Sequence, residues 1–196
     1  MPDSFLIAIV LSYLMGSIST AILICKIMGL PDPRTQGSGN PGATNVLRYG
    51  GKSATIITLL GDTFKGVIPV LIAKHYGFDA LDLSLIAFAA FFGHLYPIFF
   101  RFQGGKGVAT ALGCLTALAW PLGAMLALTW VVMAVCFRYS SLAALTAAAL
   151  APLYAWILTN PTYAAMVSVM SLLLVIRHKQ NILKLWSGEE KKIGKK

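Results

Sequence analysis

A polar stretch from Gln36 to Arg48 separates two long apolar segments near the start of the chain. It contains hydrogen-bonding side chains, glycines and a terminal arginine, namely Ser38, Asn40, Thr44, Asn45, Gly37, Gly39, Gly42 and Arg48. Glycine-rich backbone can turn consecutive N–H groups inward to bind an anion, and an arginine can hold a phosphate through two parallel hydrogen bonds. The stretch therefore predicts a phosphate cradle.

Two other interpretations apply to this stretch. The spacing of Gly37, Gly39 and Gly42 fits G-x-G-x-x-G, but a dinucleotide site needs a strand before the glycines, and an apolar membrane segment precedes them here. A solvated connector, in which Gly, Pro, Ser and Asn only make turns, remains open on this stretch alone.

A second polar stretch, from Arg101 to Gly107, places Gly104, Gly105 and Gly107 around Lys106. It comes directly before an apolar segment that we expect to be helical. The free N–H groups and positive end of such a helix favour an anion, and Lys106 adds a full charge. The alternative is a basic anchor for lipid headgroups.

A third polar stretch, Arg177 to Asn181, follows the last apolar segment. His178 could act as a base, an acid or a hydrogen-bond donor near neutral pH. It could equally be a cation that interacts with the dipole at a helix C-terminus. Asn181 is three residues further on and shares its helix face, which weakly favours a joint site.

Three further polar residues lie inside apolar segments. Asp62 and Lys65 are three residues apart, so they share one helix face, and charge in a bilayer is costly unless it is paired or faces a wet interior. Asp62 is also roughly 14 Å from the start of its helix, deep for contact with a substrate at the headgroup level. We predict a structural ion pair rather than a direct catalytic role. His94 either supports the cradle through a hydrogen bond or is a core histidine.

The composition indicates an all-α, polytopic integral membrane protein. The chain of 196 residues is 57% hydrophobic and only 12% charged, whereas a soluble domain carries about 25% charged residues. The net charge of +9 is explained by basic residues on the cytoplasmic side of a membrane, so no nucleic acid partner is inferred. Cys25, Cys114 and Cys136 have no metal-binding spacing, and we predict reduced packing residues and no metal.

We predict about seven transmembrane helices in a single domain, residues 1–196. A span needs about 20 apolar residues, and proline interrupts helices. The predicted spans are Phe5–Met28, Ser53–Ala73, Leu81–Phe100, two short helices within Val108–Phe137 divided at Trp120 to Gly123, Leu142–Ile157 and Tyr163–Ile176.

Basic residues set the predicted orientation. With the N-terminus outside, one face receives Lys26, Arg34, Arg48, Lys52, Arg101, Lys106, Arg138, Arg177, Lys179, Lys184, Lys191, Lys192, Lys195 and Lys196. Only Lys74 falls on the other face, so the positive face is predicted to be cytoplasmic, as is the C-terminus. This topology brings all three polar stretches to the cytoplasmic face.

Three blocks of the sequence also resemble a known family. They are GSGNPGATNVLR at 37–48, GHLYPIFF at 93–100 running into FQGGKGVAT at 102–110, and RH at 177–178 with NI at 181–182. Together they resemble the signature blocks of the bacterial membrane acyl-phosphate:glycerol-3-phosphate acyltransferases, the PlsY type, over the whole length of the chain. Gln103 departs from the lysine that many relatives carry, and this leaves the glycines and Lys106 intact.

The resemblance implies transfer of a fatty acyl group from acyl phosphate to the 1-hydroxyl of glycerol 3-phosphate, the first committed step of phospholipid synthesis. The implied products are lysophosphatidic acid and phosphate, with no metal, coenzyme A or nucleotide as cofactor. The implied location is the bacterial inner membrane, with the active site on its cytoplasmic face. The expected partners are the two substrates, membrane lipid and, on the tail Lys191 to Lys196, the enzyme that makes acyl phosphate; headgroup binding is the favoured role of that tail.

The resemblance also implies roles for individual residues. Glycerol phosphate would be held by Ser38, Arg48, Lys106, His178 and Asn181, and acyl phosphate with the developing oxyanion by Asn40, Thr44, Asn45 and the backbone of Gly104 and Gly105, with Gly37 and Gly39 shaping the cradle. The hydroxyl proton would go either to His178 or to a phosphate oxygen of the substrate, and we favour the substrate. No covalent nucleophile is needed, because a mixed anhydride is already activated.

Two other functions compete with this interpretation. A glycerol-phosphate acyltransferase of the soluble or monotopic type has an aspartate five residues after a histidine, and the corresponding positions here are Ala80, Phe99 and Leu183. A membrane transporter of a phosphorylated solute usually has repeats and polar residues near the bilayer midplane, whereas the polar residues here gather at one face. Asp62 and Lys65 keep the transporter open as an alternative.

Overall fold

The computed structural model describes residues 2–194, and the regular structure within that range is entirely helical. The elements are α1 (Pro2–Gly16), α2 (Thr20–Ile27), α3 (Ala43–Val46), α4 (Gly51–His75), α5 (Ala80–Leu95), the 3-10 turn η1 (Ile98–Phe100), α6 (Val108–Leu118), α7 (Trp120–Phe137), α8 (Ser140–Leu158), α9 (Pro161–Arg177) and α10 (Lys179–Trp186).

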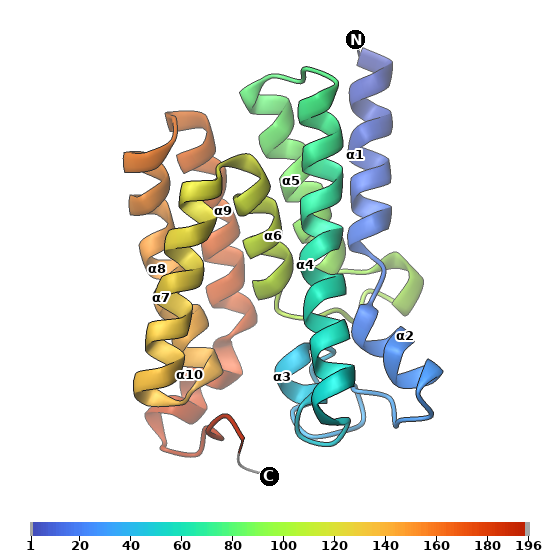
Figure 1. Cartoon of the computed structure of the whole chain (residues 1–196), viewed down its shortest axis with the longest axis vertical. Coiled ribbons are helices and arrows are strands. Elements are labelled where there is room, and N and C mark those ends of the chain that lie inside the picture. The colour runs from blue at the N-terminus through green and yellow to red at the C-terminus, as the bar shows by residue number, and fades with distance from the viewer. Residues whose placement is uncertain (1, 195–196) are drawn as a thin grey trace.

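The long helices form an elongated bundle. Figure 1 shows α1, α4, α5 and the pair α7 and α8 running along the long axis, with α6 and α9 between these groups and the short α2, α3 and α10 at the end that carries the C-terminus. Glycines allow α4 and α6 to pack closely: a Cβ at Gly66 would collide with the carbonyl of Thr110, and a Cβ at Gly113 with that of Thr63. Small residues at such contacts are typical of helices in membranes.

Four helices within residues 2–194 are long and apolar enough to cross a bilayer: α4, Ala80–Phe100, α7 and α8. The count rises to six if each of two bent pairs, α1 with α2 and α9 with α10, is one span. The predicted all-helical, polytopic class is confirmed. The count of seven stays a prediction, because it requires α6, which has only 11 residues.

The predicted first span, Phe5–Met28, is wrong as a single helix. Helix α1 ends at Gly16 and α2 begins at Thr20, with a bend of 44° between them. The break frees backbone carbonyls, and Lys65 Nζ donates to the carbonyl of Ile18 at 2.7 Å. A charged side chain from α4 therefore satisfies an acceptor that the helix has released.

The third predicted span, Leu81–Phe100, lies within the apolar segment Ala80–Phe100 that is long enough to cross a bilayer, but this segment is not one continuous helix. Helix α5 ends at Leu95, two residues before Pro97, which has no N–H group and disfavours a helical conformation in the residue before it. The chain then turns through η1 and takes a left-handed conformation at Arg101 and Phe102, with φ of 55° and 58°. This turn directs the Gly104–Gly107 segment back along the bundle.

Residues 108–137 form the two predicted helices, α6 and α7. They are divided at Ala119, just before the predicted position, and Pro121 lies in the first turn of α7. Proline is favoured there because the first N–H groups of a helix have no intrahelical partner. The proline therefore starts the second helix of this pair.

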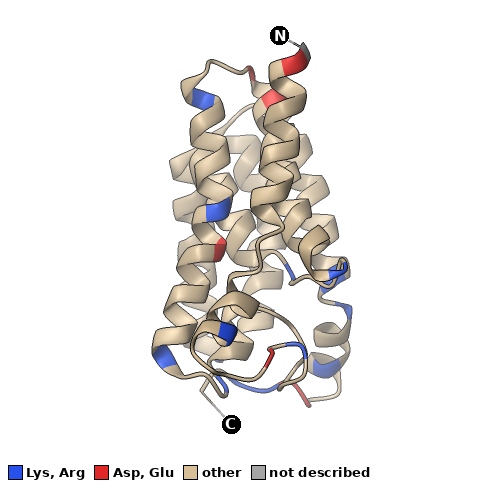
Figure 2. Cartoon of the chain, turned by 90° about the vertical axis from the view of Figure 1, so that its right-hand side faces the viewer, with Lys and Arg blue, Asp and Glu red and all other residues tan. Residues whose placement is uncertain are grey.

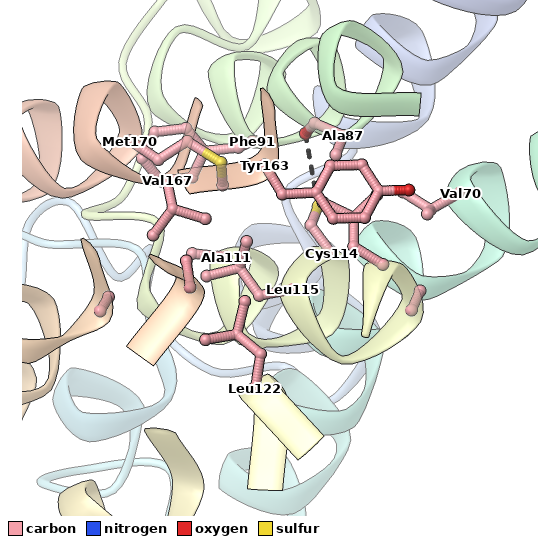
Figure 3. Packing of buried hydrophobic residues seen from close by; sticks show 14 of the residues in the cluster. Val70, Ala87, Phe91, Ala111, Cys114, Leu115, Leu122, Tyr163, Val167 and Met170 are labelled. Atoms are coloured by element: carbon pink, nitrogen blue, oxygen red, sulfur yellow. Dashed lines mark hydrogen bonds between the residues drawn. The ribbon is translucent and has the colours of Figure 1, made fainter. Parts of the chain in front are cut away.

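Buried side chains from α4, α5, α6 and α9 fill the centre of the bundle. Figure 3 shows Phe91, Cys114, Val167 and Met170 packed together, with the Cys114 thiol 3.4 Å from the carbonyl of Ala87. Cys25 and Cys114 are buried free thiols, as predicted for packing residues. The same prediction is wrong for Cys136, whose side chain is exposed.

Charge is distributed unevenly along the bundle axis. Figure 2 shows Lys and Arg gathered mainly in the half of the molecule that carries the C-terminus. The stretches Gln36–Arg48 and Arg177–Asn181 lie at the same end as α3 and α10, and Arg101–Gly107 lies nearer the middle of the long axis, before the start of α6. The arrangement supplies the charge asymmetry on which an orientation can be argued.

Candidate active site

A cavity of about 390 Å³ opens among the charged loops and the helices α4 and α6 to α9. Its polar lining consists of Ser38, Asn40, Thr44, Asn45, Arg48, Asp62, His94, Lys106, Ser140, Ser141, Ser171, His178, Asn181, Glu190 and Lys191. Its remaining wall is mainly apolar and includes Leu59, Leu112, Leu115, Leu126, Trp130, Val131, Ala148, Met170 and Leu174. All three polar stretches of the sequence meet at this cavity, as the predicted topology required.

Asn45 organises the cradle loop from the inside. Its side-chain oxygen accepts a hydrogen bond from the backbone N–H of Ser38 at 2.9 Å, and its Nδ2 donates to the carbonyls of Pro33 and Gln36, each at 2.9 Å. Gly37 packs so closely on Asn45 that a Cβ would collide with Oδ1, and its φ of 57° is left-handed. Asn45 thus shapes the loop through its polar atoms and also lines the cavity, and its role in substrate binding stays a prediction.

The remaining cradle side chains surround the mouth of the cavity. Thr44 Oγ1 lies 3.0 Å from Ser140 Oγ, which joins the cradle to the start of α8. The Arg48 guanidinium lines the cavity and has no hydrogen-bond or ion-pair partner among residues 2–194. It lies close enough to Lys106 to lower the pKa of that side chain. An anionic substrate could therefore bind between the side chains of Arg48 and Lys106.

Lys106 belongs to a chain of polar side chains that crosses the cavity mouth. Lys106 Nζ lies 2.5 Å from Asn181 Oδ1, Asn181 Nδ2 donates to Glu190 Oε1 at 2.8 Å, and Ser141 Oγ donates to the same oxygen at 2.6 Å. Burial lowers the pKa of Lys106 to about 8, while the nearby Glu190 carboxylate acts in the opposite direction. Ser141 and Glu190 were not predicted as site residues from the sequence.

The Gly104–Gly107 segment is held from two sides. Arg177 donates to the carbonyl of Gly104 at 2.9 Å and to that of Gly105 at 3.0 Å, and its guanidinium lies 5.4 Å from the centre of the Tyr96 ring. The N–H of Gly105 donates to the carbonyl of His94 at 3.1 Å. This corrects the expectation that Gly105 offers its amide to a substrate. The cavity is lined instead by Lys106, Gly107 and Val108, at the start of α6.

His178 lies in the turn between α9 and α10 and is almost fully buried. Its Nδ1 is 2.8 Å from the carbonyl of Leu174, and because a carbonyl only accepts, Nδ1 carries the proton. Burial lowers the pKa of His178 to about 4, so the ring is neutral near pH 7. Its Nε2 then has a free lone pair. The interpretation of His178 as a charged partner of the helix dipole is therefore not supported.

Asp62, Lys65 and His94 form a buried group deeper in the cavity wall. Lys65 Nζ lies 2.8 Å from Asp62 Oδ1, so the predicted ion pair is confirmed. His94 Nδ1 lies 3.8 Å from the same oxygen. The depth argument for Asp62 needs correction, because the cavity extends far enough into the bundle that Asp62 and His94 both line it.

The structure places the other predicted residues as follows. The residues that line the cavity are Ser38, Asn40, Thr44, Arg48, Lys106, His178 and Asn181. The predicted residues that do not line it are Gly37, Gly39, Gly104, Gly105 and Lys65. No group of three or more His, Cys, Asp or Glu side chains suited to a metal occurs among the described residues. The structure therefore brings predicted side chains from all three polar stretches to one cavity.

The chain is similar over its whole length to known acyltransferases. Residues 6–188 match the family model described as glycerol-3-phosphate acyltransferase. The chain is 55% identical to the glycerol-3-phosphate acyltransferase of Methylococcus capsulatus, over 100% of this chain and 99% of the relative. Identity to the enzyme of the same name from Vibrio vulnificus is 54%, over 95% of this chain and 92% of the relative.

Two crystal structures have the same fold. Both are described as PlsY, an integral membrane glycerol 3-phosphate acyltransferase, one in its glycerol 3-phosphate form and one in its lysophosphatidic acid form. The first has a TM-score of 0.92 and 40% identity, with 97% of this chain and 96% of that chain covered. The second has a TM-score of 0.90 and 39% identity over the same shares of the two chains.

Proposed function

Because the chain belongs to the glycerol-3-phosphate acyltransferase family, we propose that it uses acyl phosphate as its acyl donor and that the reaction takes place in the cavity described above. The chain is an acyltransferase that acts on glycerol 3-phosphate and gives lysophosphatidic acid. The proposal adds the donor, the roles of individual residues and the side of the membrane on which they act.

The observation that carries the proposal is the division of the cavity into a cationic mouth and an apolar interior. Arg48 and Lys106 line its mouth, and apolar side chains of α6, α7 and α8 line most of its remaining depth, where Asp62 and His94 also lie. Acyl phosphate has the same division, with a charged head and a hydrocarbon tail. A nucleotide-bearing donor would need further polar contacts beyond the mouth, and the described lining offers few.

Two anions must approach each other for this reaction, and their repulsion is the main obstacle. In the proposed complex Arg48, Lys106, Ser38, His178 and Asn181 hold glycerol 3-phosphate. Asn40, Thr44 and the backbone amides of Lys106 and Gly107, before the first turn of α6, hold the acyl phosphate and the developing oxyanion. Because the donor is already activated, acyl transfer can be catalysed by holding both substrates in place and stabilising the oxyanion.

The bond changes are those of a direct acyl transfer. The 1-hydroxyl oxygen of glycerol 3-phosphate forms a bond to the acyl carbon, and the bond from that carbon to the phosphate oxygen breaks. Phosphate leaves with the electron pair, and a phosphate oxygen of the donor accepts the hydroxyl proton. His178 is neutral near pH 7, and its Nε2 orients the hydroxyl in this scheme.

The charged end of the bundle is proposed to face the cytoplasm of a bacterium across its inner membrane, with the N-terminus outside. Basic residues favour that side, and most of the basic residues lie at the end that carries the cavity mouth. The basic tail from Lys191 onward would then contact anionic headgroups or the enzyme that makes acyl phosphate. In the sequence only Asp62 and Lys65 favoured the transporter, and since they pair with each other that argument is weaker.

A comparison of donors tests the proposal. Purified protein in lipid is given glycerol 3-phosphate with either palmitoyl phosphate or palmitoyl-coenzyme A, and lysophosphatidic acid is measured. We expect lysophosphatidic acid to form with palmitoyl phosphate and not with palmitoyl-coenzyme A. Product from the coenzyme A donor alone would leave the family assignment intact and overturn the proposed donor.

A further inference from the structure

Three buried polar side chains in the wall of the cavity have no part in the scheme above. Asp62 and Lys65 lie on α4 and are 3% and 6% exposed, and His94, near the end of α5, is 7% exposed. Asp62 and His94 line the same cavity as Arg48 and Lys106. Asp62 Oδ1 is paired with Lys65 Nζ at 2.8 Å, whereas His94 Nδ1 has no hydrogen-bond partner within the part of the chain that the structure describes.

Stability is a weak explanation for this group. A buried ion pair seldom stabilises a fold more than apolar residues of the same size, because both charges lose their hydration. Ionisable residues at membrane depth are also costly and usually mark a functional site. The cost of burying Asp62 and Lys65 is therefore better explained by an effect on the cavity.

His94 is in contact with the Gly104–Gly107 segment. Its carbonyl accepts the hydrogen bond from the N–H of Gly105, and a Cβ at Gly105 would collide with Nε2 of the His94 ring. A Cβ at Gly104 would likewise collide with the carbonyl of His94. The path of the two glycines is thus shaped by the backbone and the ring of one residue.

Asp62 lies on the other side of the His94 ring. Its Oδ1 is 3.8 Å from His94 Nδ1, close enough to attract a proton on that nitrogen and to leave Nε2 directed at Gly105. Lys65 fixes the carboxylate at 2.8 Å and is itself anchored to the carbonyl of Ile18. The three side chains therefore link the break between α1 and α2 to the glycine segment.

A second link joins Asp62 to the same segment. Thr110, in the first turn of α6, donates from its hydroxyl to the backbone carbonyl of Asp62 at 2.9 Å. The start of α6, just after Gly107, is thereby fixed to the turn of α4 that carries the carboxylate. A shift of Asp62 would move both the glycines and the helix end that follows them.

We propose that Asp62, Lys65 and His94 form a positioning unit that holds the Gly104–Gly107 segment, and with it Lys106, in the shape that binds the phosphate of glycerol 3-phosphate. None of the three touches a reacting atom in this proposal. They act through the segment, so they set substrate affinity rather than the chemical step. The inference rests on the proposed role of Lys106, and it deepens that proposal.

The test compares three variants in the full-length protein. Asp62→Asn with Lys65→Met removes both charges together and so avoids an unpaired buried lysine, His94→Gln removes Nδ1, and the triple variant combines them. Lys74→Met is the matched control, because Lys74 lies on the same helix and donates to the carbonyl of Leu118. The dissociation constant of glycerol 3-phosphate is measured by calorimetry without any acyl donor, together with KM, kcat and the melting temperature.

A positioning unit predicts a dissociation constant and a KM raised about tenfold in the double variant and in His94→Gln, with kcat reduced by less than about threefold. The triple variant should be no worse than the more affected of these two, because members of one unit are not additive. A lowered melting temperature with an unchanged dissociation constant, or effects that multiply in the triple variant, would overturn the inference.

Failure of the proposed function can be told apart from failure of this inference. If the wild-type protein bound glycerol 3-phosphate but did not turn over acyl phosphate, the proposed donor would be wrong. The affinities of the variants would still decide whether the positioning unit exists.

Discussion

Lys106 and Asn181 are 75 positions apart in the chain, and their side chains meet at 2.5 Å across the mouth of the cavity. One residue precedes α6 and the other lies in α10, so the contact closes the site between the second and third polar stretches. The first polar stretch, the cradle loop, adds Arg48 to the lining of the same cavity.

Glu190 is predicted to tune the charge of Lys106. Removing its carboxylate in Glu190→Gln removes the group that opposes the burial effect, so the pKa of Lys106 should fall below its value of about 8. If the ammonium binds phosphate, kcat/KM declines as pH rises through this pKa, and in the variant the decline should begin at lower pH. A pH profile of kcat/KM for both proteins checks this, with Glu189→Gln as the matched control. A decline at the same pH in both proteins would show that Glu190 does not act on Lys106.

His178 is predicted to orient the substrate rather than to accept its proton. The His178→Gln variant should retain kcat within about tenfold of the wild type, because an amide can still hold a hydroxyl, whereas loss of a general base costs about 10²–10⁴-fold. Steady-state kinetics at saturating concentrations of both substrates measure this. A loss of about four orders of magnitude would instead make His178 the base.

Arg177 is predicted to hold the glycine segment in place. Its guanidinium spans the carbonyls of Gly104 and Gly105, and a lysine carries the same charge without the planar fork. The Arg177→Lys variant should therefore raise KM for glycerol 3-phosphate about tenfold, equivalent to about 1.4 kcal/mol. Arg101→Lys, an exposed position outside the cavity, is the control and should leave KM unchanged. Equal KM values for glycerol 3-phosphate in both variants would show that Arg177 does not hold the glycine segment in its binding shape.

The apolar part of the cavity is predicted to hold the acyl chain. Ala148 on α8 lines it, and the larger side chain in Ala148→Leu should lower kcat/KM for palmitoyl phosphate more than for a short-chain acyl phosphate. The neighbouring Ala149 is exposed and does not line the cavity, so Ala149→Leu is the matched control. The ratio of kcat/KM for the two donors measures the effect. An unchanged ratio in Ala148→Leu would place the chain elsewhere.

Much of the site could be predicted from the sequence because it is local. Three polar stretches stand out against apolar spans, and the spacing of Asp62 and Lys65 fixes their pairing on one helix. The division of residues 108–137 into two helices followed from a proline. Such features depend on a few neighbouring residues, so the sequence is sufficient to locate them.

The parts that were missed depend on contacts between distant segments. Glu190 directly precedes the basic tail that begins at Lys191, and only the fold brings it to Asn181 and Ser141. The amide of Gly105 faces His94 because the chain turns at Arg101, a left-handed position that its residue type does not indicate. The break after Gly16 follows no proline. The carbonyl of Ile18 within this break accepts a hydrogen bond from Lys65, 47 positions away.

The most direct test of the central claim measures both products at once. Purified protein in lipid is given palmitoyl phosphate with and without glycerol 3-phosphate, and phosphate and lysophosphatidic acid are quantified in the wild type, Arg48→Ala, Lys106→Ala and the exposed control Lys52→Ala. The account predicts that the wild type and Lys52→Ala release the two products in equal amounts and only when glycerol 3-phosphate is present. Arg48→Ala and Lys106→Ala should each lose at least about 100-fold in kcat/KM, on the order of 2.7 kcal/mol. Phosphate release without glycerol 3-phosphate, or near-normal transfer by both alanine variants, would contradict it.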